Sequence, residues 1–267
     1  MLSEDKDLVE IFLTPLRKCS DYMPAFGQAA SKGLSLSDFQ NLYGEDLFYR
    51  WLGLDDPMVY SAHKAAGGLT SVYRQLGVGS ERLLRKILRL QFNLSEQQMN
   101  WGYDYAKPNN SNGIHTLDAR ILSSDLIDRD SEILTKWLEN VRQFLDPNGK
   151  LISPLTGVVF EVRQGYKSAD SKRQNADLRF GMRAYQENLL PSLIILSSQV
   201  SEAVAQRYRK DGMLVLTGTS SRDPNLSTFA FFKEIVGYDL ASFFDRNSSV
   251  IKSEVKIIIE KLLSPQD

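Results

Sequence analysis

The sequence predicts an α/β fold of the α+β kind, with a mixed central sheet flanked by helices and a helical N-terminal region. Three observations favour it. A strand–helix–strand pattern at 192–217 implies two parallel strands joined by a crossover helix. A Pro- and Gly-containing turn at 154–157 implies antiparallel pairing. Residues 1–66 instead place apolar side chains at helical spacing.

The chain before residue 80 is predicted to be helical throughout. One helix begins near Leu36, with Ser37 as its possible N-cap. The stretch AAGGLTSVYRQLGVGS (65–80) lacks the residue order of a phosphate-binding loop, so its glycines are expected to be turns between helices. A further helix is expected from Ser80, as N-cap, to about Gln91.

The rest of the chain alternates strands and helices. We expect, in order, a strand at 114–122, a helix at 130–145, a hairpin formed by KLIS and TGVVFEVRQ, a helix at 171–188 stopped by Pro191, the strand SLIILSS, the helix QVSEAVAQRYRKDG, the strand MLVLTG and a helical tail from Ser227. This order divides the chain into a helical region, 1–80, and a core with C-terminal helices, 81–267.

The composition is that of an ordinary globular protein. Hydrophobic residues make up 42% and charged residues 24% of the 267, and the net charge of −1 gives no global sign of affinity for nucleic acid or membranes. The single cysteine, Cys19, excludes an intrachain disulfide framework. The N-terminus lacks a signal-peptide pattern, and no apolar run is long enough to span a bilayer. We expect a cytoplasmic protein without a membrane partner.

Two acidic residues stand in predicted buried strands. Glu161 closes the apolar run GVVFE, and Asp118 lies inside TLDARIL. Burying a carboxylate is costly unless cations or hydrogen-bond donors meet it. Carboxylates from neighbouring strands can share a Mg²⁺ ion, which is usually held by one or two of them together with phosphate oxygens. The alternative is that either acid caps a strand or pairs with an arginine.

The order helix–strand–strand–strand–helix–strand, with Asp118 in LDARI and Glu161 in FEVRQGYKSADSKRQNAD, resembles the PD-(D/E)XK nuclease superfamily, typified by type II restriction endonucleases. The tail FFKEIVGYDLASFF is similar to the closing helical segment of several restriction enzymes. The resemblance covers roughly Glu81 to Phe244. It implies a restriction-endonuclease-like core with Asp118 and Glu161 as Mg²⁺ ligands, and Glu81 as an acid contributed by the first core helix.

The sequence departs from the superfamily pattern in two places. Arg163 stands where the motif has lysine; it can stabilise negative charge but cannot act as a base. Lys167 is the nearest lysine that shares the strand parity of Glu161. The two acids are also 43 residues apart, so the helix at 130–145 has to be an insertion. Otherwise Asp146, in LDPNGK, becomes a rival metal ligand.

Polar and basic side chains gather around the second acid. A run of basic and amide residues follows the strand that ends in Glu161, and a basic stripe is expected on the helix after Ser80. Arginine and amide side chains recognise the edges of DNA bases, and several cations on one face of a helix favour contact with phosphates. The alternative is a solvated surface. The candidate DNA contacts are Lys172, Arg173, Gln174, Asn175, Arg179, Arg183, Arg82, Arg85, Lys86 and Arg89.

These features predict a Mg²⁺-dependent, site-specific endonuclease of the type II restriction kind that cleaves double-stranded DNA. Catalysis would rest on Asp118, Glu161, Glu81 and a cation at Arg163 or Lys167. Cleavage of a symmetric site would favour a homodimer. Two alternatives stay open: a non-catalytic nucleic-acid-binding module with a degenerate nuclease fold, in which Arg163 marks the lost lysine, and a repair or RNA nuclease. The two histidines, His63 and His115, are interpreted as structural.

Overall fold

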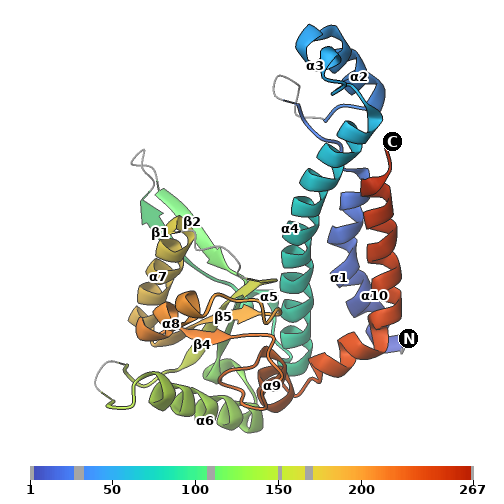
Figure 1. The fold of residues 1–267 in the computed structure, drawn as a ribbon. Coiled ribbons are helices and arrows are strands. Elements are labelled where there is room, and N and C mark those ends of the chain that lie inside the picture. The colour runs from blue at the N-terminus through green and yellow to red at the C-terminus, as the bar shows by residue number, and fades with distance from the viewer. Residues whose placement is uncertain (1–2, 27–32, 107–111, 150–151, 166–170, 266–267) are drawn as a thin grey trace. The chain divides into compact units, whose positions relative to one another are not determined.

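The computed structural model describes residues 3–26, 33–106, 112–149, 152–165 and 171–265, with only the backbone described for 3–4, 106, 112 and 171–176. The chain divides into two compact units (Figure 1). The first combines residues 1–79 with 244–267, and the second comprises residues 80–243.

The first unit is helical. Its elements are α1 (Ser3–Arg17), the 3-10 turn η1 (Lys18–Asp21), α2 (Leu36–Glu45), α3 (Leu47–Trp51), the first part of α4 (Pro57–Phe92) and most of α10 (Leu240–Leu263). The sequence predicts these helices from apolar periodicity. The N-cap of α2 is Ser35, whose hydroxyl accepts from the amide of Asp38; the prediction of Ser37 was wrong by two residues.

Both ends of the chain meet in this unit. Arg246 pairs with Asp5 at 2.6 Å, and Arg17 pairs with Glu254 at 2.9 Å. Phe12 and Phe244 also form an edge-to-face pair, with ring centroids 5.5 Å apart. Residues 244–267, predicted to belong to the core, therefore group with the N-terminal helices.

The glycines of α4 are not turns, which corrects the sequence prediction: one helix runs from Pro57 to Phe92. A Cβ atom added at Gly79 would overlap the backbone carbonyl of Phe12, and one at Gly68 would overlap the side chain of Leu262. The glycines thus permit α1 and α10 to approach the backbone of α4 closely. This tertiary gain offsets the loss of about 1 kcal/mol that each glycine costs in a helix.

The second unit holds a mixed sheet. Its elements, in chain order, are the end of α4, α5 (Glu96–Met99), β1 (Trp101–Ala106), β2 (Asn112–Leu117), β3 (Ala119–Leu122), η2 (Ser123–Asp125), α6 (Asp128–Leu145), β4 (Gly157–Arg163), α7 (Ser171–Gln186), β5 (Leu189–Ile195), α8 (Glu202–Lys210), β6 (Leu214–Leu216), α9 (Thr228–Phe231), the π-helical turn η3 (Phe232–Val236) and the start of α10.

The four-stranded sheet has the order β3-β4-β5-β6. β3 is antiparallel to β4, and β4, β5 and β6 are parallel to one another. The parallel pair around the crossover helix α8 confirms the expectation for 192–217. The predicted hairpin was wrong, because the partner of β4 is β3, across the inserted helix α6. The single strand at 114–122 was wrong too: β2 pairs with β1 in a separate two-stranded sheet, and the chain bends before β3.

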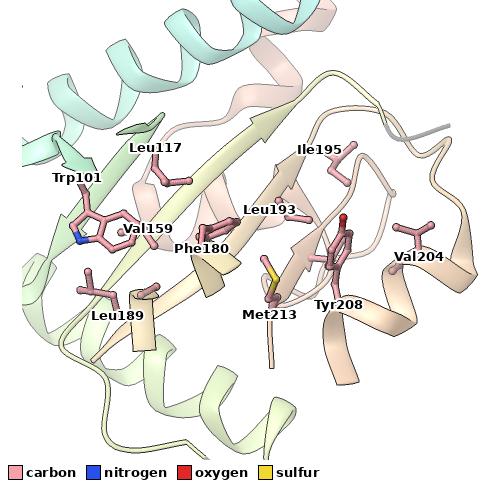
Figure 2. Packing of buried hydrophobic residues seen from close by; sticks show 13 residues of the cluster. Trp101, Leu117, Val159, Phe180, Leu189, Leu193, Ile195, Val204, Tyr208 and Met213 are labelled. Carbon is pink, nitrogen blue, oxygen red and sulfur yellow. The ribbon is translucent and has the colours of Figure 1, made fainter. Parts of the chain in front are cut away.

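Helices cover both faces of the sheet, as predicted (Figure 1). On one face, Val159 and Leu193 of the strands pack with Phe180 of α7 and Tyr208 of α8 (Figure 2). On the other face, Phe231 lies 5.6 Å from Phe160 of β4 and 4.8 Å from Trp137 of α6, measured between ring centroids.

Pro191 was predicted to end a helix but lies inside β5. It pairs with Val159 of β4, whereas β6 pairs only with Ser192–Ile194. The missing amide hydrogen of Pro191 therefore costs no hydrogen bond to β6. Within the described ranges, no helix combines the length and the apolar character that crossing a membrane requires.

Candidate active site

Asp118 lies at the bend between β2 and β3. Its amide donates to the carbonyl of Phe160 at 3.1 Å, although the register pairs Phe160 with Ala119. Two successive residues thus face one residue of β4, which is the pattern of a β-bulge. A bulge redirects the side chain at its position, and here the Asp118 carboxylate accepts a hydrogen bond from the amide of Val162 at 2.6 Å. Asp118 is therefore held beside Glu161 by the backbone.

Arg85 of α4 fixes the bend from the other side. Its Nη1 donates to the backbone carbonyl of Asp118 at 2.6 Å, and the same guanidinium bonds Glu96 and Asn100. Arg89 also pairs with Glu96, at 2.7 Å. Two members of the predicted basic stripe are thus engaged in contacts inside the unit. Arg82 is exposed and Lys86 is half-buried, and their contact with DNA stays a prediction.

Glu161 lies on β4 two residues before Arg163, on the same face, as the strand parity predicts. The guanidinium of Arg163 lies 3.1 Å from the Glu161 carboxylate and 2.7 Å from that of Asp177 on α7. The second oxygen of Asp177 accepts from the hydroxyl of Tyr208 at 2.8 Å. Arg163 is therefore a buried cation shared by two carboxylates, and this network fixes the orientation of Glu161.

The surroundings of Asp118 favour its protonated form. Burial, the largest cause, and the negative charges of Glu161 and Glu81 together raise the pKa of Asp118 to about 8, against the opposing effects of the Val162 amide and the charge of Arg163. Glu81 of α4 contributes to this rise in the pKa of Asp118, and its role as a catalytic acid stays a prediction. At neutral pH most molecules retain a proton on Asp118.

Comparison with protein-family models, curated proteins and solved structures gives no significant match.

The other predicted site residues lie away from Asp118 and Glu161 or outside the described residues. Asp146, the rival ligand, is buried at the end of α6, where its carboxylate accepts from the amide of Ile152 at 2.9 Å. Arg179 and Arg183 are exposed on α7, and Arg183 donates to Gln186 at 3.0 Å. Lys167 lies outside the described residues, as do the side chains of Lys172, Arg173, Gln174 and Asn175.

Sequence reasoning missed four groups near the site: Asp177, Tyr208, Tyr103 and His115. Tyr103 and His115 are cross-strand partners in the β1–β2 hairpin, and their side chains meet at 3.2 Å. Burial lowers the pKa of His115, and burial raises the pKa of Tyr103, which also feels the charges of Arg179 and Glu161. The alternation WGYDYA was the one available signal, since it places Trp101 and Tyr103 on one face.

The hairpin also borders a depression of about 500 Å³. Tyr103, Asp104 and Ile114 line it from the two strands, and Arg183 and Glu187 line it from α7 and the turn that follows. Both charge signs are present in it, so the cavity by itself does not select an anionic ligand.

Proposed function

We propose that this chain is a Mg²⁺-dependent endonuclease of the type II restriction kind, with a restriction-endonuclease-like core within residues 80–243, that hydrolyses double-stranded DNA. The observation that carries the proposal is the bulge before β3, which sets the Asp118 carboxylate against the backbone next to Glu161. Two neighbouring carboxylates in a partly buried position are costly unless a cation meets them, and a shared Mg²⁺ ion would offset that cost.

The donor set fits magnesium. Across residues 3–265, apart from the gaps given above, no cluster of three or more His, Cys, Asp or Glu side chains lies close enough to bind one metal ion. Mg²⁺ does not need one, because it is usually held by one or two carboxylates, with water and phosphate oxygens completing its shell. Asp118 and Glu161 would hold it. When bound, it would supply an activated water and stabilise charge on the phosphate.

The protein residues have separable roles in this proposal. Asp118 has to lose its proton before it can act as a ligand, so cation binding would release a proton near neutral pH. Arg163 stays charged and cannot take a proton from water. The contacts of Arg163 with Glu161 and Asp177 support a role as a positioning residue that fixes the orientation of the Glu161 carboxylate.

One observation favours a different function. Arg163 already pairs with Glu161, so half of the acidic pair is neutralised within the protein. A non-catalytic nucleic-acid-binding module with a degenerate site would retain such a pair. This second candidate predicts DNA binding without cleavage under any divalent cation.

Supercoiled plasmid separates the two candidates. The wild type should nick or linearise plasmid with Mg²⁺ or Mn²⁺ but not with Ca²⁺. Glu161→Gln should lose at least about 100-fold in rate, since even residues behind the metal ligands cost 10- to 100-fold. Glu132→Gln, an exposed acid on α6, is the matched control and should cut normally.

The catalytic proposal is wrong if the wild type never cuts under either cation, or if Glu161→Gln cuts as fast as the wild type. Discrete bands on phage DNA would mark a site-specific enzyme, and a smear would mark a general nuclease. A gel shift without cleavage would establish the binding module.

A further inference from the structure

The first unit displays an unusual apolar surface on α2, α3 and the start of α4. Trp51 is 75% exposed, Phe48 62% and Met58 79%. Single exposed apolar side chains are normal on a monomer, but a cluster within 17 residues of sequence is not. We call this set the α3 surface; its members are Leu42, Leu47, Phe48, Trp51, Leu52 and Met58.

The α3 helix is mostly apolar. Four of its five residues, LFYRW, are apolar or aromatic, and none of the five is buried. Exposed apolar clusters of this kind usually mark an interaction site. The exposure therefore indicates a missing partner.

The α3 surface is held in place by contacts within the first unit. The Asp46 carboxylate caps α3 by accepting from the amides of Phe48 and Tyr49, at 2.9 and 3.1 Å. The ring of Tyr49 packs on Tyr43 of α2 at 4.7 Å between centroids. Tyr43 in turn belongs to a small aromatic core with Phe39. The exposed side chains are thus presented on a fixed framework, which keeps the entropic cost of binding low.

The charges around the surface restrict the partner. Residues 42–58 contain four acids, Glu45, Asp46, Asp55 and Asp56, against one base, Arg50. Nucleic acid and anionic membranes are attracted to Lys and Arg and repelled by such a surface. A protein partner fits, provided that it offers an apolar face and charges of both signs.

A second copy of the chain meets these requirements. We infer that the α3 surface pairs two copies about a two-fold axis, with the apolar centres in contact and Arg50 of each copy toward Glu45 or Asp55 of the other. A two-fold interface uses the same patch twice, so a patch with an apolar centre and charges of both signs complements itself.

The available area agrees with a dimer. A side chain of this size has a full accessible area of roughly 200 Å². The exposed fractions of the six residues of the α3 surface therefore correspond to an accessible area on the order of 700 Å² per copy. A standard interface buries about 800 Å² per partner. The inference rests on the first unit only and does not depend on the proposed nuclease activity.

Tryptophan fluorescence provides a direct probe. All three tryptophans lie in the described part of the chain, and Trp101 and Trp137 are 5% and 2% exposed. In a monomer, therefore, only the fluorescence of Trp51 should be accessible to the quencher acrylamide. We expect the quenchable fraction to fall as protein concentration rises, in parallel with a sedimentation mass that approaches twice 30.2 kDa.

The decisive variant is Trp51→Glu, which should raise the dimer dissociation constant at least about 30-fold, as for a central interface aromatic. Because Trp51 is exposed, its replacement should leave the far-UV circular dichroism and the melting temperature of the monomer unchanged. Ile127→Lys is the control: Ile127 is 70% exposed but lies in the second unit, and its replacement should not affect dimerisation.

A charge exchange tests the two-fold arrangement. Arg50→Glu should weaken the dimer, and combining it with Asp55→Arg or Glu45→Arg should restore association if the pair meets across the axis. Failure of both combinations would overturn the arrangement. A wild type that stays monomeric up to about 100 µM, with Trp51 fully quenchable, would overturn the inference. Flotation of the monomer with phosphatidylcholine vesicles, abolished by Trp51→Glu, would also overturn it.

Discussion

Replacing Asp118 by Asn should stabilise the metal-free protein. The pKa of this carboxyl group is raised from its ordinary 3.8 to about 8, first by burial and then by Glu161. The unfolded chain ionises Asp118 above pH 4 while the folded chain retains the proton, so the wild type loses stability as pH rises through this range. Asn is neutral at every pH, and its side-chain oxygen can still accept from the amide of Val162.

The size of this stabilisation follows from the two pKa values of Asp118. Each pKa unit corresponds to about 1.4 kcal/mol, so a fully buried group with this pKa would cost about 4 kcal/mol at pH 7. Asp118 is only half-buried, and solvent screening reduces the cost. We therefore expect Asp118→Asn to raise the free energy of unfolding at pH 7 by about 2 kcal/mol. The gain should vanish near pH 4 and level off above pH 8.

Urea denaturation in EDTA, at pH 4.5, 7 and 8.5, measures this difference. Emission from Trp101 and Trp137 reports on the transition, because both are buried in the unit that contains Asp118. Glu132→Gln, at an exposed position, should change nothing. Added Mg²⁺ should stabilise the wild type and leave Asp118→Asn unaffected, since a ligand stabilises only the state that binds it. An Asn variant that is less stable than the wild type, or a difference that does not depend on pH, would refute the electrostatic reasoning.

Three further predictions concern packing and buried charge. Arg163→Met should destabilise the protein by about 3–5 kcal/mol in denaturant titrations, because it leaves the buried carboxylate of Asp177 and the half-buried carboxylate of Glu161 without their cation; a loss below about 1 kcal/mol would mean that Arg163 is not the cation that holds them. Tyr208→Phe removes the hydrogen bond to the second oxygen of Asp177 and should cost about 1–2 kcal/mol in the same assay; an unchanged stability would mean that this bond contributes nothing. Gly77→Ala should stabilise α4 by up to about 1 kcal/mol, since nothing lies within 4 Å of the new methyl group, whereas Gly79→Ala should destabilise it by about 1–3 kcal/mol by clashing with a carbonyl of α1. Equal melting temperatures for the two alanine variants would contradict the packing role of Gly79.

Much of the second unit could be predicted from local patterns. The amphipathic run at 130–145 and the apolar strands around 192–217 carry their structure in their own residues, so their type followed from periodicity. The parity argument also placed Glu161 and Arg163 on one face of β4. What parity could not supply was the second carboxylate on Arg163, because Asp177 reaches it from a different element.

The wrong sequence predictions share a physical cause: each of these features is set by contacts between segments far apart in the sequence. The glycines of α4 look like turn residues until the helices that pack against them are known. The pairing of β4 with β3 depends on two segments separated by the whole of α6, and a nearby Pro–Gly turn suggested a closer partner. The bend at Asp118 is likewise set by Phe160, Val162 and Arg85, none of which is adjacent in sequence.

The joining of both chain ends in one unit has a consequence for biosynthesis. Asp5 is buried against Arg246, which is made 241 residues later. At 5–20 residues per second, the ribosome needs roughly 10–50 s to supply that partner. The 80–243 unit is complete before then, whereas α1 and α4 emerge early with their apolar faces uncovered. The N-terminal helices thus depend on a segment that is synthesised long after them, and a premature stop that removes α10 should leave them as targets for chaperones and proteases.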